Sequence, residues 1–170
     1  MISCFLNITG SNDYEILRCP GVGNFKVFSG DDKYRNKIEC AHIPKKSIPP
    51  GIYWISDRPS GGALSRIYTG IKDIFSGNHH SKWFALYRQD SKIDDETIYK
   101  GTIRSEFRLH PKGHVNGTSW GCITFKNISD FEILRNALLQ SITFKLAKTN
   151  YKVYGYIIVT SNRINKKCVE

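Results

Sequence analysis

The stretch that decides the fold is FRLHPKGHVNGTSWGCITF, residues 107–125. Two strand-like apolar runs flank a segment that holds His110, His114, Ser119 and Cys122, with three glycines among them. This composition fits an active-site loop that carries a cysteine nucleophile. It also fits a glycine-rich turn that ends in a buried structural cysteine, because free cysteine is among the most buried residue types.

Cys122 has the sequence context of a reactive thiol. Because Gly121 has no Cβ, a substrate carbonyl can approach the backbone there, and a tight turn can direct successive N–H groups at a developing oxyanion. The apolar run 123–125 predicts a strand that holds the thiol rigidly. A thiolate forms with the help of a nearby base, and both His110 and His114 can fold back toward Cys122.

The rest of the chain is typical of a mainly β protein (β-rich α+β) in a single domain, residues 1–170. Short apolar runs separated by turn residues predict strands at 4–8, 14–19, 21–30, 52–56, 82–89, 102–109 and 151–161. Residues 90–101 are typical of a polar loop, and residues 162–170 are expected to form a frayed tail.

Two segments have the apolar spacing of helices. Ser129, with Glu132 three positions later, predicts a capping box, and the apolar residues that follow lie on one face, which predicts one clear helix at 129–140. Residues 63–80 have helical spacing interrupted by Gly70, which predicts a short helix or a helical lid.

The net charge of +10 implies acidic partners. Nucleic acid is one candidate, but the basic residues are scattered along the chain rather than gathered in a patch, so we expect no nucleic acid. Carboxylate-bearing cell-wall glycans would be attracted equally, and a basic surface that serves only solubility is the alternative. No stretch approaches the roughly 20 apolar residues of a membrane-spanning helix, and the start of the chain lacks the basic region of a signal peptide. We therefore expect no membrane insertion, and synthesis in the cytoplasm without a signal peptide.

The five cysteines show neither a C-x-x-C pair nor the spacing of zinc ligands, and His79 and His80 with Cys122 do not have it either, so we expect no metal. In an oxidising compartment, four cysteines can form two disulfides in any of three pairings. Cys122 is then the cysteine expected to be left free. In the cytoplasm all five are expected to be reduced.

His110 together with SWGCI at 119–123 resembles the active-site signature of L,D-transpeptidases, in which a histidine precedes Ser/Thr-x-Gly-Cys-Ile/Val. IPPGIYWI at 48–55 is similar to a strand entry of the same superfamily. The fuller resemblance is to its shorter branch, the antibacterial effectors of type VI secretion, and it covers most of residues 15–125. Four motifs of that branch occur here in order: GVGNFKVFSG at 21–30, RN at 35–36, IPPGIYWISDRPSGG at 48–62, and RLHP with SWGCI within 108–123.

This resemblance implies an L,D-transpeptidase-like β-sandwich or barrel and gives catalytic roles to four residues. Cys122 matches the nucleophile and His110 the general base. Ser119 matches the Ser/Thr of the motif and is expected to brace the loop by hydrogen bonding. Gly121, with the Cys122 amide, is expected to contact the oxyanion.

Two positions depart from the larger family, which usually has histidine where Trp120 stands and arginine where Thr124 stands. The substrate-facing charge of that arginine must then come from elsewhere, for which Arg108 and Arg58 are candidates. His114 and Trp120 are further candidate substrate contacts.

Ser29, Gly30 and Arg58 can also line the substrate cleft, since serine, glycine and arginine suit a carboxylate-rich peptide. Alternatively, they are turn residues without a role in binding.

The chemistry that the resemblance implies is acyl transfer on peptidoglycan tetrapeptide stems, by L,D-carboxypeptidation or by L,D-transpeptidation and D-amino acid exchange, with no cofactor. It implies a monomeric toxin, delivered by type VI secretion components to the periplasm of target bacteria and countered by a cognate immunity protein. Two alternatives stay open. One is another cysteine peptidase or amidase, although a papain-like enzyme places its cysteine before its histidine. The other is a basic β domain that binds cell wall or nucleic acid without catalysis.

Overall fold

The computed structural model describes residues 1–58, 82–113 and 119–169. The predicted helix or lid at 63–80 and the candidate residue His114 lie outside the described residues.

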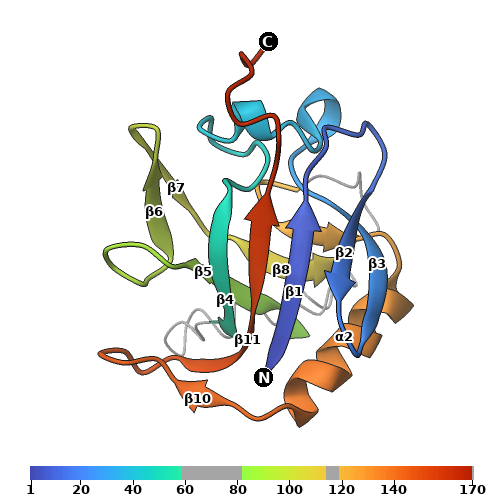
Figure 1. Ribbon diagram of the computed structural model, residues 1–170, viewed down its shortest axis with the longest axis vertical. Helices are drawn as coiled ribbons and strands as arrows, with labels where there is room; N and C mark the ends of the chain where they lie inside the picture. The colour runs from blue at the N-terminus through green and yellow to red at the C-terminus, as the bar shows by residue number, and fades with distance from the viewer. Residues whose placement is uncertain (59–81, 114–118, 170) are drawn as a thin grey trace.

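The centre of the protein is a closed barrel of eight strands (Figure 1). These are β1 (Ile2–Asn7), β2 (Glu15–Cys19), β3 (Gly23–Phe28), β4 (Gly51–Asp57), β5 (Phe84–Arg88), β8 (Arg108–Pro111), β9 (Ile123–Phe125) and β11 (Lys152–Thr160). Their order around the barrel is β1-β2-β3-β9-β8-β5-β4-β11, and the pairing of β11 with β1 closes the ring. Neighbours are antiparallel except for the parallel pairs β1–β11 and β8–β9. The mainly β prediction is therefore confirmed, in its barrel form.

Three further short strands lie outside the ring. β10 (Phe144–Lys145) pairs with β11, and β6 (Glu96–Tyr99) pairs with β7 (Thr102–Ser105) in a separate hairpin that projects from the barrel (Figure 1). The prediction of a polar loop at 90–101 was wrong, because β6 lies within it. The predicted strand 102–109 is in fact two strands, β7 and β8, separated at Glu106, whose φ of 59° is incompatible with a strand.

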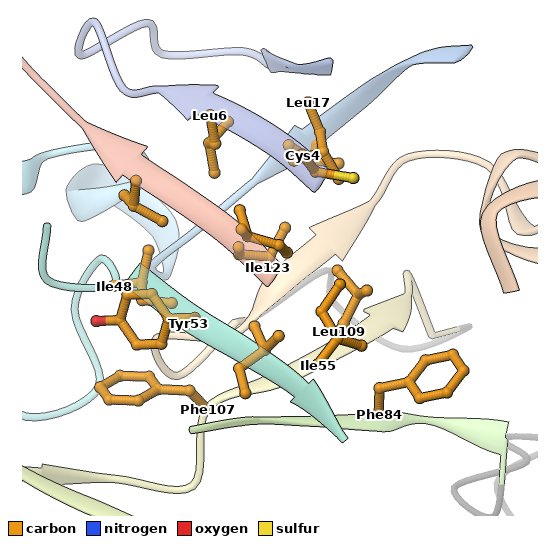
Figure 2. Close-up of a cluster of buried hydrophobic side chains, with 14 of the residues drawn as sticks. Cys4, Leu6, Leu17, Ile48, Tyr53, Ile55, Phe84, Phe107, Leu109 and Ile123 are labelled. Carbon is orange, nitrogen blue, oxygen red and sulfur yellow. The ribbon is translucent and has the colours of Figure 1, made fainter. Parts of the chain in front are cut away.

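The inward side chains of the barrel form the core (Figure 2). Tyr53 and Ile55 come from β4, Leu109 from β8 and Ile123 from β9, and all four are fully buried. The ring of Phe107 packs edge-on against that of Tyr53, with 5.7 Å between the ring centroids. This packing fixes which face of β8 and β9 is turned away from the core.

The α-helix of the described residues is α2 (Ile128–Gln140), which confirms the predicted helix. Its Phe131, Leu134 and Leu138 side chains are buried against the barrel. The predicted capping box is wrong. Ile128 is already the first helical residue, so Ser129 lies inside the first turn, and Asn127 occupies the N-cap position without a capping side-chain bond. Glu132 pairs instead with Lys82 at 3.1 Å. Among the described residues, no helix has the length and apolar character needed to cross a membrane.

Two short 3-10 helices, η1 (Asp32–Tyr34) and η2 (Ile38–Cys40), lie between β3 and β4. η2 is joined to the end of the chain by the Cys40–Cys168 disulfide, and Arg163 forms an ion pair with Glu39 at 2.5 Å. The tail predicted to be frayed is therefore attached to the body of the protein. The second disulfide, Cys4–Cys19, joins the neighbouring strands β1 and β2.

Candidate active site

His110 and Cys122 come together because β8 and β9 are parallel neighbours. Leu109 lies opposite Ile123, and His110 lies opposite Thr124. Leu109 and Ile123 belong to the core (Figure 2), and strand side chains alternate, so His110 and Thr124 face the other side of the barrel wall. Cys122 directly precedes β9 and is two residues from Thr124. The pairing of these two strands thus places both predicted catalytic residues in one part of the wall.

Cys122 is the one cysteine outside the two disulfides, as expected from the sequence. Cys122 is only 9% exposed, and its Sγ lies 3.7 Å from the carbonyl oxygen of Glu106. Burial raises the pKa of the thiol from its ordinary 9.0 to about 11, against the opposing effect of the Arg108 amide and guanidinium. The thiol is therefore protonated at neutral pH in this arrangement, and a base is needed to make it nucleophilic.

His110 is held in a defined tautomer. Its Nδ1 lies 2.8 Å from the carbonyl oxygen of Pro111, which can only accept a hydrogen bond, so in the neutral ring Nδ1 carries the proton. The lone pair of Nε2 then accepts a hydrogen bond from the Thr124 hydroxyl at 3.2 Å. The ring stacks on Trp83, with 4.1 Å between centroids. Nε2 is thus the nitrogen able to take a proton.

Ser119 braces the loop, as its place in the motif predicts. Its hydroxyl is buried and donates to the carbonyl oxygen of Cys122 at 2.7 Å. This bond spans the turn and fixes the main chain on both sides of Gly121.

Gly121 is required for a different reason from the one expected. Its φ of 95° is in the left-handed region that favours glycine. A Cβ at this position would lie 2.7 Å from Nη2 of Arg104 and 3.2 Å from the carbonyl oxygen of Lys46. The space beside the glycine is therefore filled by the protein itself, on that side, and not left open for a substrate.

Arg108, a candidate substrate contact, is occupied by a carboxylate. Its guanidinium makes two 2.6 Å hydrogen bonds to Asp95, one to each carboxylate oxygen, and a third to the carbonyl of Phe107. The main chain and side chain of Arg108 nevertheless remain next to Cys122, since both lower the pKa of its thiol.

Ser29 and Gly30 have structural partners. The Ser29 hydroxyl is buried and accepts a hydrogen bond from the Ile48 amide at 2.8 Å, and the Ser29 amide donates to Asn36 Oδ1 at 2.9 Å. Gly30 has a φ of 89°, and a Cβ there would lie 2.7 Å from the carbonyl oxygen of Tyr34. Both residues join the end of β3 to the segment before β4.

The two remaining candidates, Arg58 and Trp120, each take part in a contact between a cation and an aromatic ring. Arg58 lies over Trp83, 5.8 Å from its centroid, and Trp83 in turn stacks on His110. Trp120 is 60% exposed, and its ring is covered by the Lys45 ammonium at 4.4 Å. Trp120 is thus an exposed aromatic surface two residues from the candidate nucleophile. Within the described ranges, no group of three or more His, Cys, Asp or Glu side chains is placed to hold a metal ion.

Residues 23–149, which include this whole arrangement, match the family model of the Tlde1 domain. The chain belongs to the Tlde1 domain family. This is the type VI secretion L,D-transpeptidase effector family, so the resemblance seen in the sequence is confirmed. Membership implies an enzyme that acts on peptidoglycan, is secreted to target cells and has an immunity protein. No curated protein matches the sequence.

Sequence reasoning missed three residues that surround Cys122 in this Tlde1 domain. Glu106 contributes the carbonyl nearest to the thiol, Asp95 neutralises Arg108, and Arg104 fills the space beside Gly121. Arg104 and Glu106 belong to a stretch that looked like one ordinary strand, and Asp95 to an ordinary polar loop. No local pattern marks any of the three, because their roles depend on contacts with residues that are distant in the sequence.

Proposed function

We propose that this Tlde1 domain is a cysteine acyltransferase that acts on peptidoglycan tetrapeptide stems through a thioester on Cys122. The observation that carries the proposal is the state of two side chains. Cys122 alone is left out of the disulfides, and His110, on the adjoining strand, is held with Nδ1 protonated and with Nε2 as the nitrogen that can accept a proton. A free thiol with a base on the neighbouring strand supplies the two groups required for nucleophilic catalysis by cysteine.

In the first half-reaction, Nε2 of His110 takes the thiol proton and Sγ of Cys122 attacks the carbonyl carbon at the L-centre of meso-diaminopimelate. The bond to the terminal D-alanine then breaks, and protonated His110 returns the proton to the leaving amine. The product is free D-alanine and a thioester between the stem and Cys122. The amides of the Gly121–Cys122 turn are the candidates to bind the oxyanion.

In the second half-reaction, the acceptor decides the product. Water gives a shortened stem, which is L,D-carboxypeptidation. The amine of a second stem gives a cross-link, and the amine of a free D-amino acid gives exchange. In each case His110 takes a proton from the acceptor, and the sulfur leaves as a thiolate that is protonated again.

The resting geometry requires a local rearrangement before the first step. The thiol is directed to the Glu106 carbonyl, and Nε2 of His110 is engaged by the Thr124 hydroxyl. Rotation of the Cys122 side chain toward His110, with loss of the Thr124 bond, would bring base and nucleophile together. Catalytic hydrogen bonds that form only in the substrate complex are common.

The two disulfides favour action in an oxidising compartment, which supports the periplasm of the target bacterium as the place of action. The substrate there would be the tetrapeptide stem, and the partners would be an immunity protein and type VI delivery components. We propose no role for nucleic acid.

Mass spectrometry of tetrapeptide muropeptides tests this function, with the wild type and Cys122→Ala compared with and without an added D-amino acid. We expect loss of one D-alanine, or its replacement by the added amino acid, with the wild type only. A melting curve of Cys122→Ala shows whether the variant is folded. Unchanged muropeptides with folded wild-type protein would contradict the proposal and favour a binding domain without catalysis.

A further inference from the structure

Arg104 is a buried arginine in β7 whose hydrogen bonds all go to main-chain carbonyls. It is only 2% exposed. Its guanidinium donates to the carbonyl oxygens of Ala41, of Lys46 at 3.0 Å and of Ser47 at 3.3 Å. Within the described ranges it has no ion pair with a carboxylate. Burial lowers the pKa of this guanidinium to about 10, so it is still a cation at neutral pH.

The cation lies against the main chain that carries the nucleophile. Nη2 is 2.7 Å from the point that a Cβ on Gly121 would occupy, so the guanidinium fills the place of the missing side chain. A charge on Cys122 raises the pKa of Arg104, which means that the guanidinium and a Cys122 thiolate stabilise each other. Because the Coulomb energy of two charges is shared, the cation also favours the thiolate, by less than Arg108 does.

Arg108 is the other arginine near Cys122, and its amide and guanidinium are the groups that lower the pKa of the thiol most. It is bound on both guanidinium nitrogens by Asp95, and the Asp95 carboxylate raises the pKa of the Cys122 thiol. The positive charge of Arg108 is thus partly cancelled at the sulfur. Arg104 has neutral carbonyls where Arg108 has a carboxylate, so its charge is not cancelled in this way.

We propose that Arg104 is a second counter-charge of the Cys122 thiolate, beside Arg108, held in position by the carbonyls of residues 41–47 and by the space that Gly121 leaves. It acts on the nucleophile through the Gly121–Cys122 main chain and does not contact the stem peptide. This inference rests on the proposed function in taking Cys122 as the nucleophile.

The rate of Cys122 alkylation by iodoacetamide at neutral pH tests the proposal, since the other four cysteines are in disulfides. Only the thiolate reacts, so each unit by which the thiol pKa rises slows alkylation about tenfold. Arg104→Gln keeps most of the length and the amide donors of the side chain but not its charge. We expect Cys122 in this variant to be alkylated more slowly than in the wild type, by up to about tenfold. Arg104→Lys should be slowed by a smaller factor, because lysine keeps the charge but cannot donate to three carbonyls in a fork.

A purely structural role for Arg104 predicts the opposite sign, because loosening the turn would expose the buried thiol and speed its alkylation. An equal or faster rate in Arg104→Gln would therefore overturn the proposal. If that variant does not fold, Arg104→Lys decides: a slower rate supports the proposal, and an equal or faster rate overturns it.

The matched control is Arg88→Gln. Arg88 also donates to a main-chain carbonyl, that of Pro50 at 2.9 Å, also lies against a glycine, Gly51, and also contacts the β6–β7 hairpin through Thr97. It should leave the alkylation rate unchanged, and equal slowing in this control would also overturn the proposal. Alkylation does not require turnover, so the two proposals fail separately. The role of Arg104 can be overturned while muropeptide processing through Cys122 is established, and muropeptide processing can be absent while Arg104 still affects the thiol.

Discussion

The resting state of Cys122 is that of a protected thiol. The sulfur is buried, protonated at neutral pH and bonded to a main-chain carbonyl, while His110 on the next strand is bonded to a hydroxyl. The proposed reaction therefore depends on what the substrate changes in the wall of the barrel. A thiol in this state is also slow to react with oxidants and disulfides, because those reactions use the thiolate.

The raised pKa of the Cys122 thiol predicts a pH dependence of stability. Between pH 9.0 and about 11 the unfolded chain loses the thiol proton and the native protein keeps it. The native state then binds more protons, so the free energy of unfolding falls as pH rises through this window. A shift of this size corresponds to about 3 kcal/mol, present in full below the window and lost above it.

Urea unfolding at about pH 8 and about pH 11 measures the contribution of the Cys122 thiol to the free energy of unfolding, as the difference between the wild type and Cys122→Ala. Tyrosines that titrate in the same range are common to both proteins and cancel in the difference. Parallel loss of stability in the two proteins would contradict the assignment of a raised pKa to Cys122.

Among single residues of the candidate site, the sequence pointed to those that belong to a local motif and missed those that do not. Cys122, His110 and the bracing role of Ser119 follow from a short pattern of residue types. Arg104 could not be found in this way, because its importance arises from a contact with Gly121, which is seventeen positions away in sequence and lies in another element.

Among the helices and strands, prediction from the sequence likewise succeeded only where a local pattern exists. α2 was predictable because one of its faces is buried, which imposes a helical period on the apolar residues. The β6–β7 hairpin was not, because it lies outside the barrel and the two side chains that it buries, Thr97 and Arg104, are polar. Its cross-strand pair Ile98 and Ile103 is 70% and 62% exposed, so the apolar residues there carry no periodic signal.

The packing of α2 predicts a contrast between neighbouring positions. Leu134 is fully buried between the helix and the barrel, whereas Ile133 is 52% exposed. Truncation of a buried leucine costs the transfer energy of its methyl groups and leaves a cavity, so Leu134→Ala should lower the free energy of unfolding by about 2–5 kcal/mol.

Ile133→Ala is the matched control and should change the free energy of unfolding by less than about 0.5 kcal/mol, because surface substitutions away from special features have small effects. Urea denaturation of both variants measures the difference. Equal effects of the two substitutions would show that the helix does not pack on the barrel by the face that contains Leu134.

The whole molecule is closed by contacts between the ends of the chain, and these could not be read from the sequence. The strand runs 2–7 and 152–160 each have strand character, but nothing local shows that they pair, or that they do so in parallel. The cysteine pairing was likewise open among three alternatives. The apolar runs predicted a mainly β protein and the resemblance implied a sandwich or barrel, but the order of the strands came only with the structure.

The Cys40–Cys168 disulfide should contribute strongly to stability because it closes a long loop. The two cysteines are 128 residues apart, and a cross-link over such a loop removes unfolded-state entropy equivalent to about 4–5 kcal/mol. Cys168→Ser should therefore lower the urea midpoint substantially under non-reducing conditions, while Cys40 stays in place.

Val169→Ser is the control for that experiment, because it changes the adjacent, 82% exposed residue and leaves the bridge intact. A midpoint for Cys168→Ser no lower than that of Val169→Ser would show that the tail is not held by the bridge in solution.

The pairing of β1 with β11 also sets when the protein can fold. During synthesis β1 leaves the ribosome before any other barrel strand, and β11 leaves after all of them. Until then β1 and β4 both lack the neighbour that β11 provides, and the nascent chain is an open sheet with unpaired edges. Closing a ring across nearly the whole chain is a non-local step, which is intrinsically slow. The barrel is therefore expected to form after its last strand is released, as one late event, and not strand by strand.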